Sequence, residues 1–300
     1  MTPRLSARLR LVGAAVLFST GGAAIKAAAF SGWQIAGFRS GVAAIAILLM
    51  TPAARRGFTP RALLVGVAYA SCLTLYVLAN RLTTAANTIF LQSTAPLYLL
   101  VLAPWLLREP IGRRDAVYMA MVALGLALFF VGVDRPAATA PDPVRGNLLA
   151  VASGFAWALT MCGLRWLGTG QGSQGSPVAA VVAGNVTAFL IALPMALPLA
   201  AHPITDWGVI LYLGIFQIAL AYVFVTTAIR AIPALEASLI LLIEPVLNPV
   251  WAWIFQGEQP GAWALIGGGI ILAATAVKGM FDARAAAPGS LAALPIDPVD

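Results

Sequence analysis

The chain alternates between short connections and apolar stretches long enough to cross a lipid bilayer. A helix needs about 20 mostly apolar residues to span the hydrocarbon core. A window of that length predicts ten spans, at residues 10–29, 33–51, 61–80, 85–107, 115–133, 146–165, 177–200, 207–229, 235–256 and 261–280. Charged residues make up only 10% of the chain and hydrophobic residues 61%, whereas a soluble domain carries about 25% charge. The sequence therefore predicts an all-α, multi-pass membrane protein.

The basic residues lie between the spans rather than in one patch. The net charge of +7 is therefore not typical of a nucleic-acid-binding surface, and the predicted partner is the lipid bilayer. With the N-terminus in the cytoplasm, the outer connections carry only Arg81, Arg135 and Arg145, and almost all other Lys and Arg lie on the cytoplasmic side. This is the bias that orients membrane proteins. It predicts that both termini are cytoplasmic.

The two halves of the chain repeat one another weakly. When the halves are aligned, several charged, proline and glycine residues coincide: Arg81 with Arg230, Pro96 with Pro245, Glu109 with Glu258, and Gly112 with Gly261. Each half holds five predicted spans, and an odd number places the halves in opposite orientations. Inverted repeats of this kind are typical of transporters, which bind their cargo near the membrane midplane where the repeats meet. We expect ten helices in two inverted five-helix repeats around a central cavity.

The repeat also predicts the domain organisation. Residues 1–133 form the first five-helix repeat, residues 134–145 an external connecting loop, and residues 146–281 the second, inverted repeat. The Ala- and Pro-rich residues 282–300 are expected to be a disordered cytoplasmic tail.

The ninth span contains the most unusual residues for a membrane segment. Glu244 places a carboxylate in the hydrocarbon, and Pro245 and Pro249 each remove a backbone hydrogen bond. Such features persist where neighbours or water satisfy the freed groups, often beside a cavity. The alternative is that Glu244 pairs with a neighbouring base and that the prolines are ordinary kinks.

Two segments carry a resemblance to a known family. APLYLLVLAPWLLREPIGRRD and LLIEPVLNPVWAWIFQGEQPG are each a proline-broken helix that ends in Glu. With the five-plus-five pattern, they resemble the EamA-type branch of the drug/metabolite transporter superfamily, and more narrowly the bacterial aromatic amino acid exporters. The resemblance implies efflux of aromatic and other apolar amino acids across the bacterial inner membrane. A different metabolite or drug carried by the same fold is the alternative.

The resemblance implies a transporter rather than an enzyme, and the residues agree with it. The predicted spans contain no histidine and no paired carboxylates, so they offer no nucleophile–base pair and no metal ligands. Neither a cofactor nor a metal is predicted.

Charged residues inside the spans are the first candidates to bind an amino acid. Arg39 lies about two turns into its span and is a candidate partner for a substrate carboxylate. Lys26 is close enough to its helix end to reach the interface instead, so its role stays open. Glu244 is the acid that lies well inside a span. It is a candidate substrate-binding residue and could carry a proton, which would make transport pH-dependent; the alternative is that it locks the fourth and ninth helices structurally.

Polar and aromatic residues complete the predicted site. An aromatic cargo needs aromatic or apolar walls, and its polar groups need hydrogen-bond partners. The candidates are Ser19, Thr20, Tyr76, Asn80, Gln92, Tyr98, Trp157, Tyr222 and Asn248. For each, ordinary packing between helices is the alternative.

Prolines and glycines are assigned different roles. Pro96 and Pro245 occupy equivalent positions in the two repeats and are predicted hinges for alternating access. Gly37, Gly41 and the run Gly267–Gly269 are interpreted as packing residues that let helices approach closely.

Overall fold

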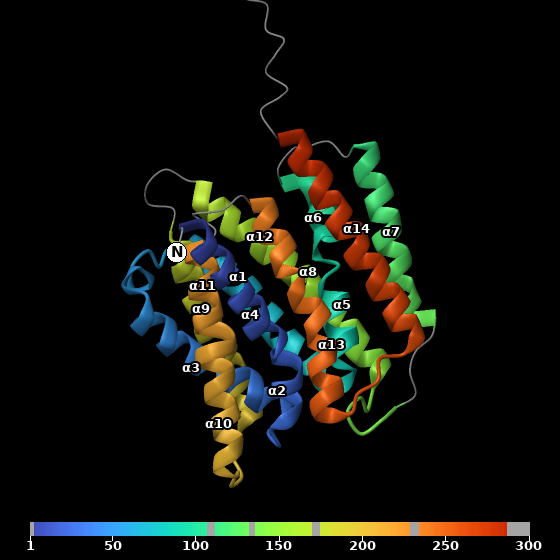
Figure 1. The fold of residues 1–300 in the computed structure, drawn as a ribbon. Helices are drawn as coiled ribbons and strands as arrows, with labels where there is room; N and C mark the ends of the chain where they lie inside the picture. The colour runs from blue at the N-terminus through green and yellow to red at the C-terminus, as the bar shows by residue number, and fades with distance from the viewer. Residues whose placement is uncertain (1–2, 107–111, 132–135, 170–174, 229–233, 287–300) are drawn as a thin grey trace, which may run out of the picture.

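The structure is a computed structural model that describes residues 3–106, 112–131, 136–169, 175–228 and 234–286. Every regular element in these residues is a helix (Figure 1). Ten segments are long and apolar enough to cross a membrane: Arg4–Ala27, Gly32–Met50, Pro60–Leu82, Ala85–Leu102, Arg113–Val131, Pro143–Leu164, Pro177–Ala196, Ile204–Ala228, Leu239–Gln256 and Ala262–Phe281. The ten predicted spans are confirmed, with ends that differ by a few residues.

Several spans consist of more than one helix. The first half contains α1 (Pro3–Ser19), α2 (Gly21–Ala27), α3 (Gly32–Met50), the short 3₁₀ helix η1 (Pro52–Arg55), α4 (Pro60–Leu82), α5 (Ala85–Gln92), α6 (Ala95–Leu106) and α7 (Arg113–Val131). The second half contains α8 (Pro143–Thr169), α9 (Pro177–Ala196), α10 (Ile204–Tyr212), the π-helical η2 (Leu213–Leu220), α11 (Ala221–Ala228), α12 (Ala234–Leu241), α13 (Ile243–Gln256) and α14 (Ala262–Ala286). The first, fourth, eighth and ninth spans are therefore interrupted.

The interruptions of the fourth and ninth spans are equivalent. α5 is followed by Ser93, whose φ and ψ are −66° and −4°. α12 and α13 are separated by Leu242, whose φ and ψ are −63° and −11°. Both residues lie three positions before the matched prolines Pro96 and Pro245. Because a proline cannot donate to the preceding turn, the two halves break their helices in the same way.

The helix contacts repeat when the halves are exchanged. α4 packs on α8 and α9 just as the eighth span packs on α1 and α3. α5 and α6 contact α8, and their counterparts α12 and α13 contact α1. The equivalent helices α3 and α9 pack on each other, as do α7 and α14. These contacts join the halves into one bundle with internal two-fold symmetry.

The halves run in opposite directions. Lys26, near the end of the first span, donates a hydrogen bond to the carbonyl of Thr139, which precedes the sixth span. The first span therefore ends at the face where its equivalent begins. In Figure 1, α1 starts at the end marked N, and α2 lies near the opposite end. This arrangement confirms the inverted repeat.

Small residues allow the closest contacts between the halves. A Cβ on Gly66 of α4 would lie 3.0 Å from the backbone nitrogen of Gly184 on α9. Gly37 and Gly41 pack against Ala192 and Phe189 of α9, as predicted. In the C-terminal run, Gly267 and Gly268 are packed, whereas nothing lies within 4 Å of a Cβ on Gly269. The packing interpretation is therefore wrong for that last glycine.

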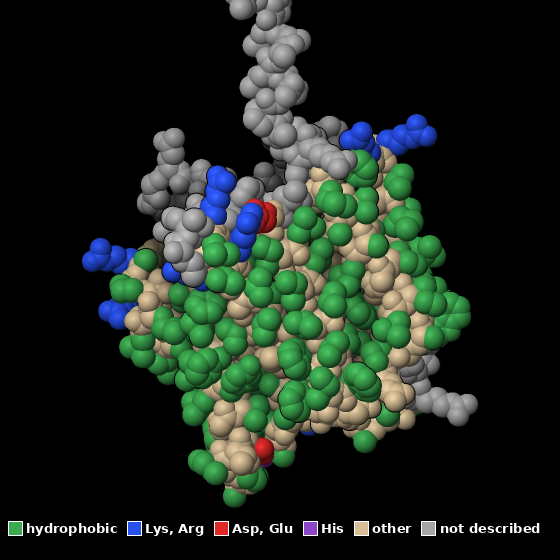
Figure 2. Space-filling model, in the orientation of Figure 1, with side chains coloured by type: hydrophobic (Ala, Val, Ile, Leu, Met, Phe, Trp, Pro, Cys, Tyr) green, Lys and Arg blue, Asp and Glu red, His purple; other side chains and the backbone are tan. Residues whose placement is uncertain are grey.

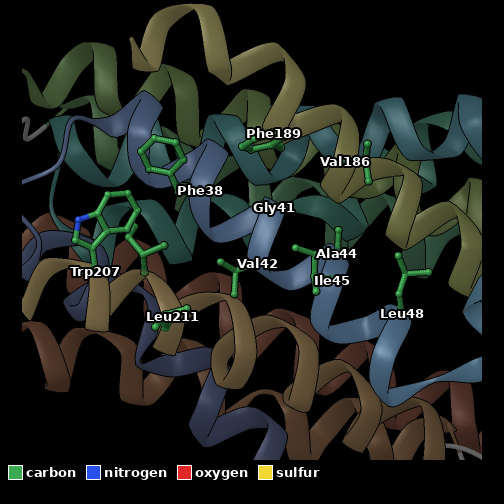
Figure 3. A pocket seen from close by; sticks show the side chains of 11 residues that line it. Phe38, Gly41, Val42, Ala44, Ile45, Leu48, Val186, Phe189, Trp207 and Leu211 are labelled. Atoms are coloured by element: carbon green, nitrogen blue, oxygen red, sulfur yellow. The ribbon is translucent and has the colours of Figure 1, made fainter. Parts of the chain in front are cut away.

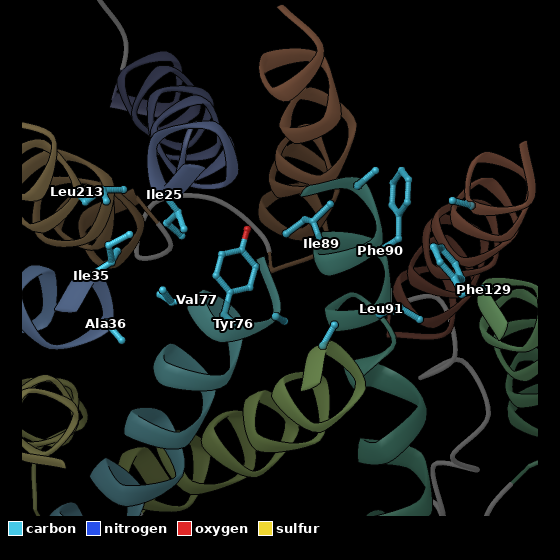
Figure 4. Close-up of a cluster of buried hydrophobic side chains, with 14 of the residues drawn as sticks. Ile25, Ile35, Ala36, Tyr76, Val77, Ile89, Phe90, Leu91, Phe129 and Leu213 are labelled. Atoms are coloured by element: carbon cyan, nitrogen blue, oxygen red, sulfur yellow. The ribbon is translucent and has the colours of Figure 1, made fainter. Parts of the chain in front are cut away.

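The largest buried cluster lies where α2, α3, α4, α5 and α7 meet the second half. Its members include Ile25, Ile35, Val77, Phe90 and Phe129. Figure 4 shows Tyr76 of α4 in the same cluster, between Ile25 and Ile89. This places a hydroxyl among aliphatic side chains at the centre of the bundle.

The surface has a basic end and an apolar belt. On the face shown in Figure 2, the Lys and Arg side chains gather at the end that carries the N-terminus, and hydrophobic side chains cover the rest. α14 is helical to Ala286, so it extends into the predicted tail. Residues 287–300, most of that tail, lie outside the described residues, as does Glu109.

Candidate substrate site between the two halves

Arg39 of α3 is buried, with 1% of its surface exposed. Its Nη2 donates to the carbonyl of Leu73 at 3.1 Å, and its Nη1 lies 3.5 Å from the Oε1 of Gln217. Its Nε has no hydrogen-bond partner among the described residues. No carboxylate in the described ranges forms a salt bridge with it. The guanidinium is therefore held in place without being neutralised.

Glu244 lies near the start of α13, directly after the break at Leu242. It is partly exposed and close enough to Tyr76 and Cys72 of α4 for electrostatic interaction. Within the part of the chain that the structure describes, no base pairs with it. The alternative that Glu244 is neutralised by a neighbouring base finds no support in those residues.

Tyr76 and Asn248 connect the two charges. The Nδ2 of Asn248 donates to the hydroxyl of Tyr76 at 3.3 Å, and both Arg39 and Glu244 interact electrostatically with that tyrosine. The Oδ1 of Asn248 is buried without a hydrogen-bond partner. We call Arg39, Tyr76, Gln217, Glu244 and Asn248 the central polar set; it combines residues of both halves.

Gln92, the last residue of α5, joins a second polar group. Its Nε2 donates to the hydroxyl of Ser153 at 2.9 Å and to the sulfur of Cys72 at 3.4 Å. Ser153 in turn donates to the carbonyl of Cys72. Cys72, a free thiol, connects this group to the central polar set because it interacts with both Arg39 and Glu244.

The predicted aromatic residues lie in two places. Trp157 and Tyr222 pack on one buried cluster with Tyr69, whose ring centroid is 6.4 Å from that of Trp157. Because Tyr69 also interacts with Arg39, this wall lies beside the central polar set. Tyr98 instead packs edge-on against Phe155, and its hydroxyl has no partner among the described residues.

Ser19 and Thr20 lie at the break between α1 and α2. The indole nitrogen of Trp251 on α13 donates to the hydroxyl of Ser19 at 2.9 Å. The hydroxyl of Thr20 lies 2.9 Å from that of Tyr212. Both predicted residues therefore contact the second half, but through partners other than the central polar set.

Asn80 is a predicted residue that lies apart from the central polar set, as Tyr98 does. It is completely buried on α4, and both of its amide atoms lack hydrogen-bond partners in the described ranges. Among the described residues, no hydrogen bond joins its side chain to the central polar set. It stays a candidate because a buried amide without partners is costly unless something else binds it.

Sequence reasoning missed Gln217, which lies in the π-helical segment η2. A Cβ on Gly21 would lie 2.8 Å from its Nε2, so the glycine makes room for this side chain. π-Helical turns are frequent at functional sites. The amide side chain inside an apolar span could have identified Gln217 as a candidate. The sequence does not show in which direction η2 orients that side chain.

Lys26 is the embedded base whose role was open. Its Nζ lies 2.7 Å from the Oε1 of Glu258, and the two side chains are 4% and 3% exposed. Glu258 is thus a buried acid, although the span boundaries had placed it in a connection. Because Lys26 is already neutralised, Arg39 is the better candidate for a substrate carboxylate.

An apolar pocket of about 480 Å³ lies away from these residues. Figure 3 shows it between α3, α9 and α10, with Phe38, Val42, Phe189 and Trp207 around it. Ile45 and Leu211 in its wall are largely exposed, so the pocket opens sideways towards the lipid. It shares no residue with the central polar set.

Comparisons with known proteins agree with this architecture. One crystal structure matches this fold with a TM-score of 0.62 and 18% sequence identity. The match covers 94% of this chain and 99% of the chain in the crystal structure. At that identity it supports the fold alone. The threonine/homoserine exporter RhtA of Escherichia coli (strain K12) is 27% identical over 205 residues. These residues are 67% of this chain but 64% of RhtA, so the chain spans less than two thirds of that relative.

A second relative matches over more of its length. The pseudopaline exporter CntI of Pseudomonas aeruginosa (strain UCBPP-PA14) is 28% identical over 249 residues, 80% of this chain and 84% of CntI. Neither exporter is named for an aromatic amino acid. The model of the EamA-like transporter family matches residues 5–131 and again residues 144–279, once in each half. The chain belongs to the EamA-like transporter family.

Proposed function

We propose that this chain exports amino acids from the cytoplasm by alternating access of its two halves. The observation that carries the proposal is the pair of charges beside Tyr76: Arg39 from the first half and Glu244 from the second, neither neutralised by the described residues. Intramembrane charges without partners are expensive, so a ligand that supplies both opposite charges is favoured. A zwitterionic amino acid does so, with its carboxylate at Arg39 and its ammonium at Glu244.

The cargo side chain is proposed to be aromatic or otherwise apolar. Tyr69, Trp157 and Tyr222 form a wall beside the charges, and flat apolar side chains pack well against such rings. Ser19, Thr20, Asn80, Gln92, Tyr98 and Asn248 supply further polar contacts. Pro96 and Pro245 are the proposed hinges, because each follows an equivalent helix break.

The proposed setting is the inner membrane of a bacterium, with both termini in the cytoplasm. The gathering of basic side chains at the end that carries the N-terminus supports this orientation. Residues 1–133 and 146–281 are the proposed moving units, with 134–145 as their external connection. The name of the threonine/homoserine exporter RhtA supports export of amino acids.

The first experiment is transport by purified protein in liposomes. Radiolabelled phenylalanine, tryptophan and methionine are compared with threonine and homoserine, against empty liposomes. Saturable transport that unlabelled aromatic amino acids compete for is the expected result. Transport of threonine or homoserine alone would contradict the proposal that the cargo is aromatic, but it would still support export of an amino acid. No transport of any of the five by folded protein would favour the alternative, another metabolite on the same fold.

The roles of the two charges are tested with analogues that lack one group. Arg39→Met should weaken transport of phenylalanine about 10–100-fold, since a hydrogen-bonded charge contributes about 1.5–3 kcal/mol, but spare phenethylamine, which has no carboxylate. Glu244→Gln should affect phenylpropionate least, because that compound has no ammonium. Ser40→Ala is the matched control, since its buried hydroxyl has no hydrogen-bond partner among the described residues. Equal losses for the amino acid and both analogues would contradict the assignment.

A further inference from the structure

A buried ion pair lies at the end of the molecule opposite the N-terminus. Lys26 of α2 lies 2.7 Å from Glu258, which follows α13, and water reaches almost none of either side chain. The Nζ of Lys26 also donates to the carbonyls of Thr83 at 2.9 Å and Thr139 at 2.5 Å. The ammonium therefore has three oxygen partners from three different segments.

Glu258 also connects α13 and α5. α13 is followed by Gly257, whose φ of 66° turns the chain so that the Glu258 N–H returns to the carbonyl of Ala252. Glycine accepts this left-handed conformation without strain. The other carboxylate oxygen of Glu258 accepts the Ala85 N–H, at the start of α5, at 2.9 Å. One carboxylate thus ties α13 of the second half to α2 and α5 of the first.

The contact continues along α2 towards the centre. The Nε2 of Gln256 donates to the carbonyl of Ala23 at 3.1 Å. A Cβ on Gly22 would lie 2.5 Å from the Oδ1 of Asn248. The seam between α2 and α13 therefore runs from the ion pair to the central polar set, and no substrate can pass between these helices while it is closed.

We propose that the Lys26–Glu258 pair is the latch of an outer gate, which separates in each transport cycle to let substrate leave on that side. The proposal rests on alternating access as the proposed function. Both residues act through the position of α2 and α13, and neither contacts substrate. The buried pair is suited to a latch because separating the two charges requires each to find new partners or water. In the closed state they neutralise each other.

The first test joins the two helices covalently. Lys26→Cys and Glu258→Cys are combined in a background with Cys72→Ser and Cys162→Ser that still transports, and a short bis-methanethiosulfonate links the two thiols. We expect the link to abolish transport and a reductant to restore it. The control links Asp115→Cys to Lys278→Cys, which replace an ion pair of similar length, 2.6 Å, between α7 and α14. That link should leave transport intact.

Two outcomes would overturn the latch. Transport that persists with the Lys26–Glu258 positions linked would mean that this end need not open. Loss of transport in both linked proteins would mean that any link across the halves blocks movement, so that the pair has no special role.

The second test needs no substrate, so it separates failure of the latch from failure of the amino acid proposal. In the same cysteine-free background, Tyr76→Cys reports access from outside to a membrane-impermeant maleimide. Glu258→Gln should raise the labelling rate several-fold, because it removes the charge but keeps an acceptor for the Ala85 N–H. Lys278→Met should leave the rate unchanged. An unchanged rate in Glu258→Gln would overturn the latch even if amino acid transport is confirmed.

Discussion

The first and ninth spans are joined by an ion pair at each end, and the two pairs differ in environment. At the end that carries the N-terminus, Arg8 of α1 pairs with Glu236 of α12, and the side chains are 54% and 31% exposed. At the opposite end, the Lys26 and Glu258 side chains are 4% and 3% exposed. Water therefore reaches the ion pair at the first end, which we call the wet end. It reaches almost none of the pair at the other, which we call the dry end.

This difference teaches which pair holds the present conformation. An exposed pair is screened by water and salt and contributes little. A buried pair is not strongly stabilising as a whole, but removing one partner leaves an uncompensated charge in the interior. The dry end should therefore be sensitive to single substitutions, and the wet end tolerant of them.

The largest expected effect is that of Lys26→Met. It should lower the free energy of unfolding by about 3–5 kcal/mol, because the carboxylate of Glu258 remains buried without its base. Arg8→Met should lower it far less, because an exposed pair contributes little. Thermal and denaturant unfolding of both variants in the same detergent measures the difference.

The double variant Lys26→Met/Glu258→Gln is the control for this prediction. It should recover part of the lost stability, since no unpaired charge stays buried. Equal stabilities for Lys26→Met and Arg8→Met would break the comparison between the two ends.

A smaller effect is expected from glycines along the same helix pair. Gly22→Ala places a Cβ 2.5 Å from the Oδ1 of Asn248 and 2.9 Å from the Cβ of Ala85. Such overpacking should destabilise the protein by about 1–3 kcal/mol. Gly13→Ala, on α1, meets only the ring of Phe224 at 3.3 Å. Since alanine favours a helix by about 1 kcal/mol over glycine, that variant should be close to native in unfolding experiments. The reverse order would contradict a tight seam at the dry end.

The smallest effect concerns pH at the wet end. The hydrogen bond from Arg8 lowers the pKa of Glu236 below its ordinary value. A lowered pKa means that the folded state favours the carboxylate, so its contribution is present above the ordinary glutamate range and is lost as the pH falls through the lowered pKa. Native protein should melt slightly above Glu236→Gln at pH 7, and this difference should vanish in acid and shrink in 1 M salt. A difference that grows on acidification would show the opposite sign and refute the assignment.

Much of the fold was predictable because its signals are local. Each span is visible as a run of apolar residues, and Pro96 and Pro245 mark equivalent places in the halves. The matching breaks at Ser93 and Leu242 follow from those prolines. The π-helical η2 has no such signal, because its geometry depends on how α3 and α1 pack around it.

The site was predictable as a list but not as an arrangement. Arg39, Glu244 and Asn248 were identified because polar groups are rare in spans. Their grouping around Tyr76 depends on how α3, α4 and α13 cross. Gln217 and Trp251 were not predicted. The structure adds them because Gln217 contacts Arg39 and Trp251 donates to Ser19. Asn80 and Tyr98 were identified in the same way, as polar or aromatic residues inside predicted spans. The way the helices cross leaves both of them apart from that group.

The sequence by itself determined that this protein crosses the membrane ten times in two related halves, because hydrophobicity over about 20 residues decides membrane insertion segment by segment. Tertiary structure alone decided which charges are neutralised. Lys26 pairs with Glu258 although the two residues lie far apart in the sequence, whereas Arg39 and Glu244 both lie near Tyr76 and form no salt bridge with a described residue. The reason is physical: the partner of a buried charge is set by which helices pack together, and distance along the chain does not enter.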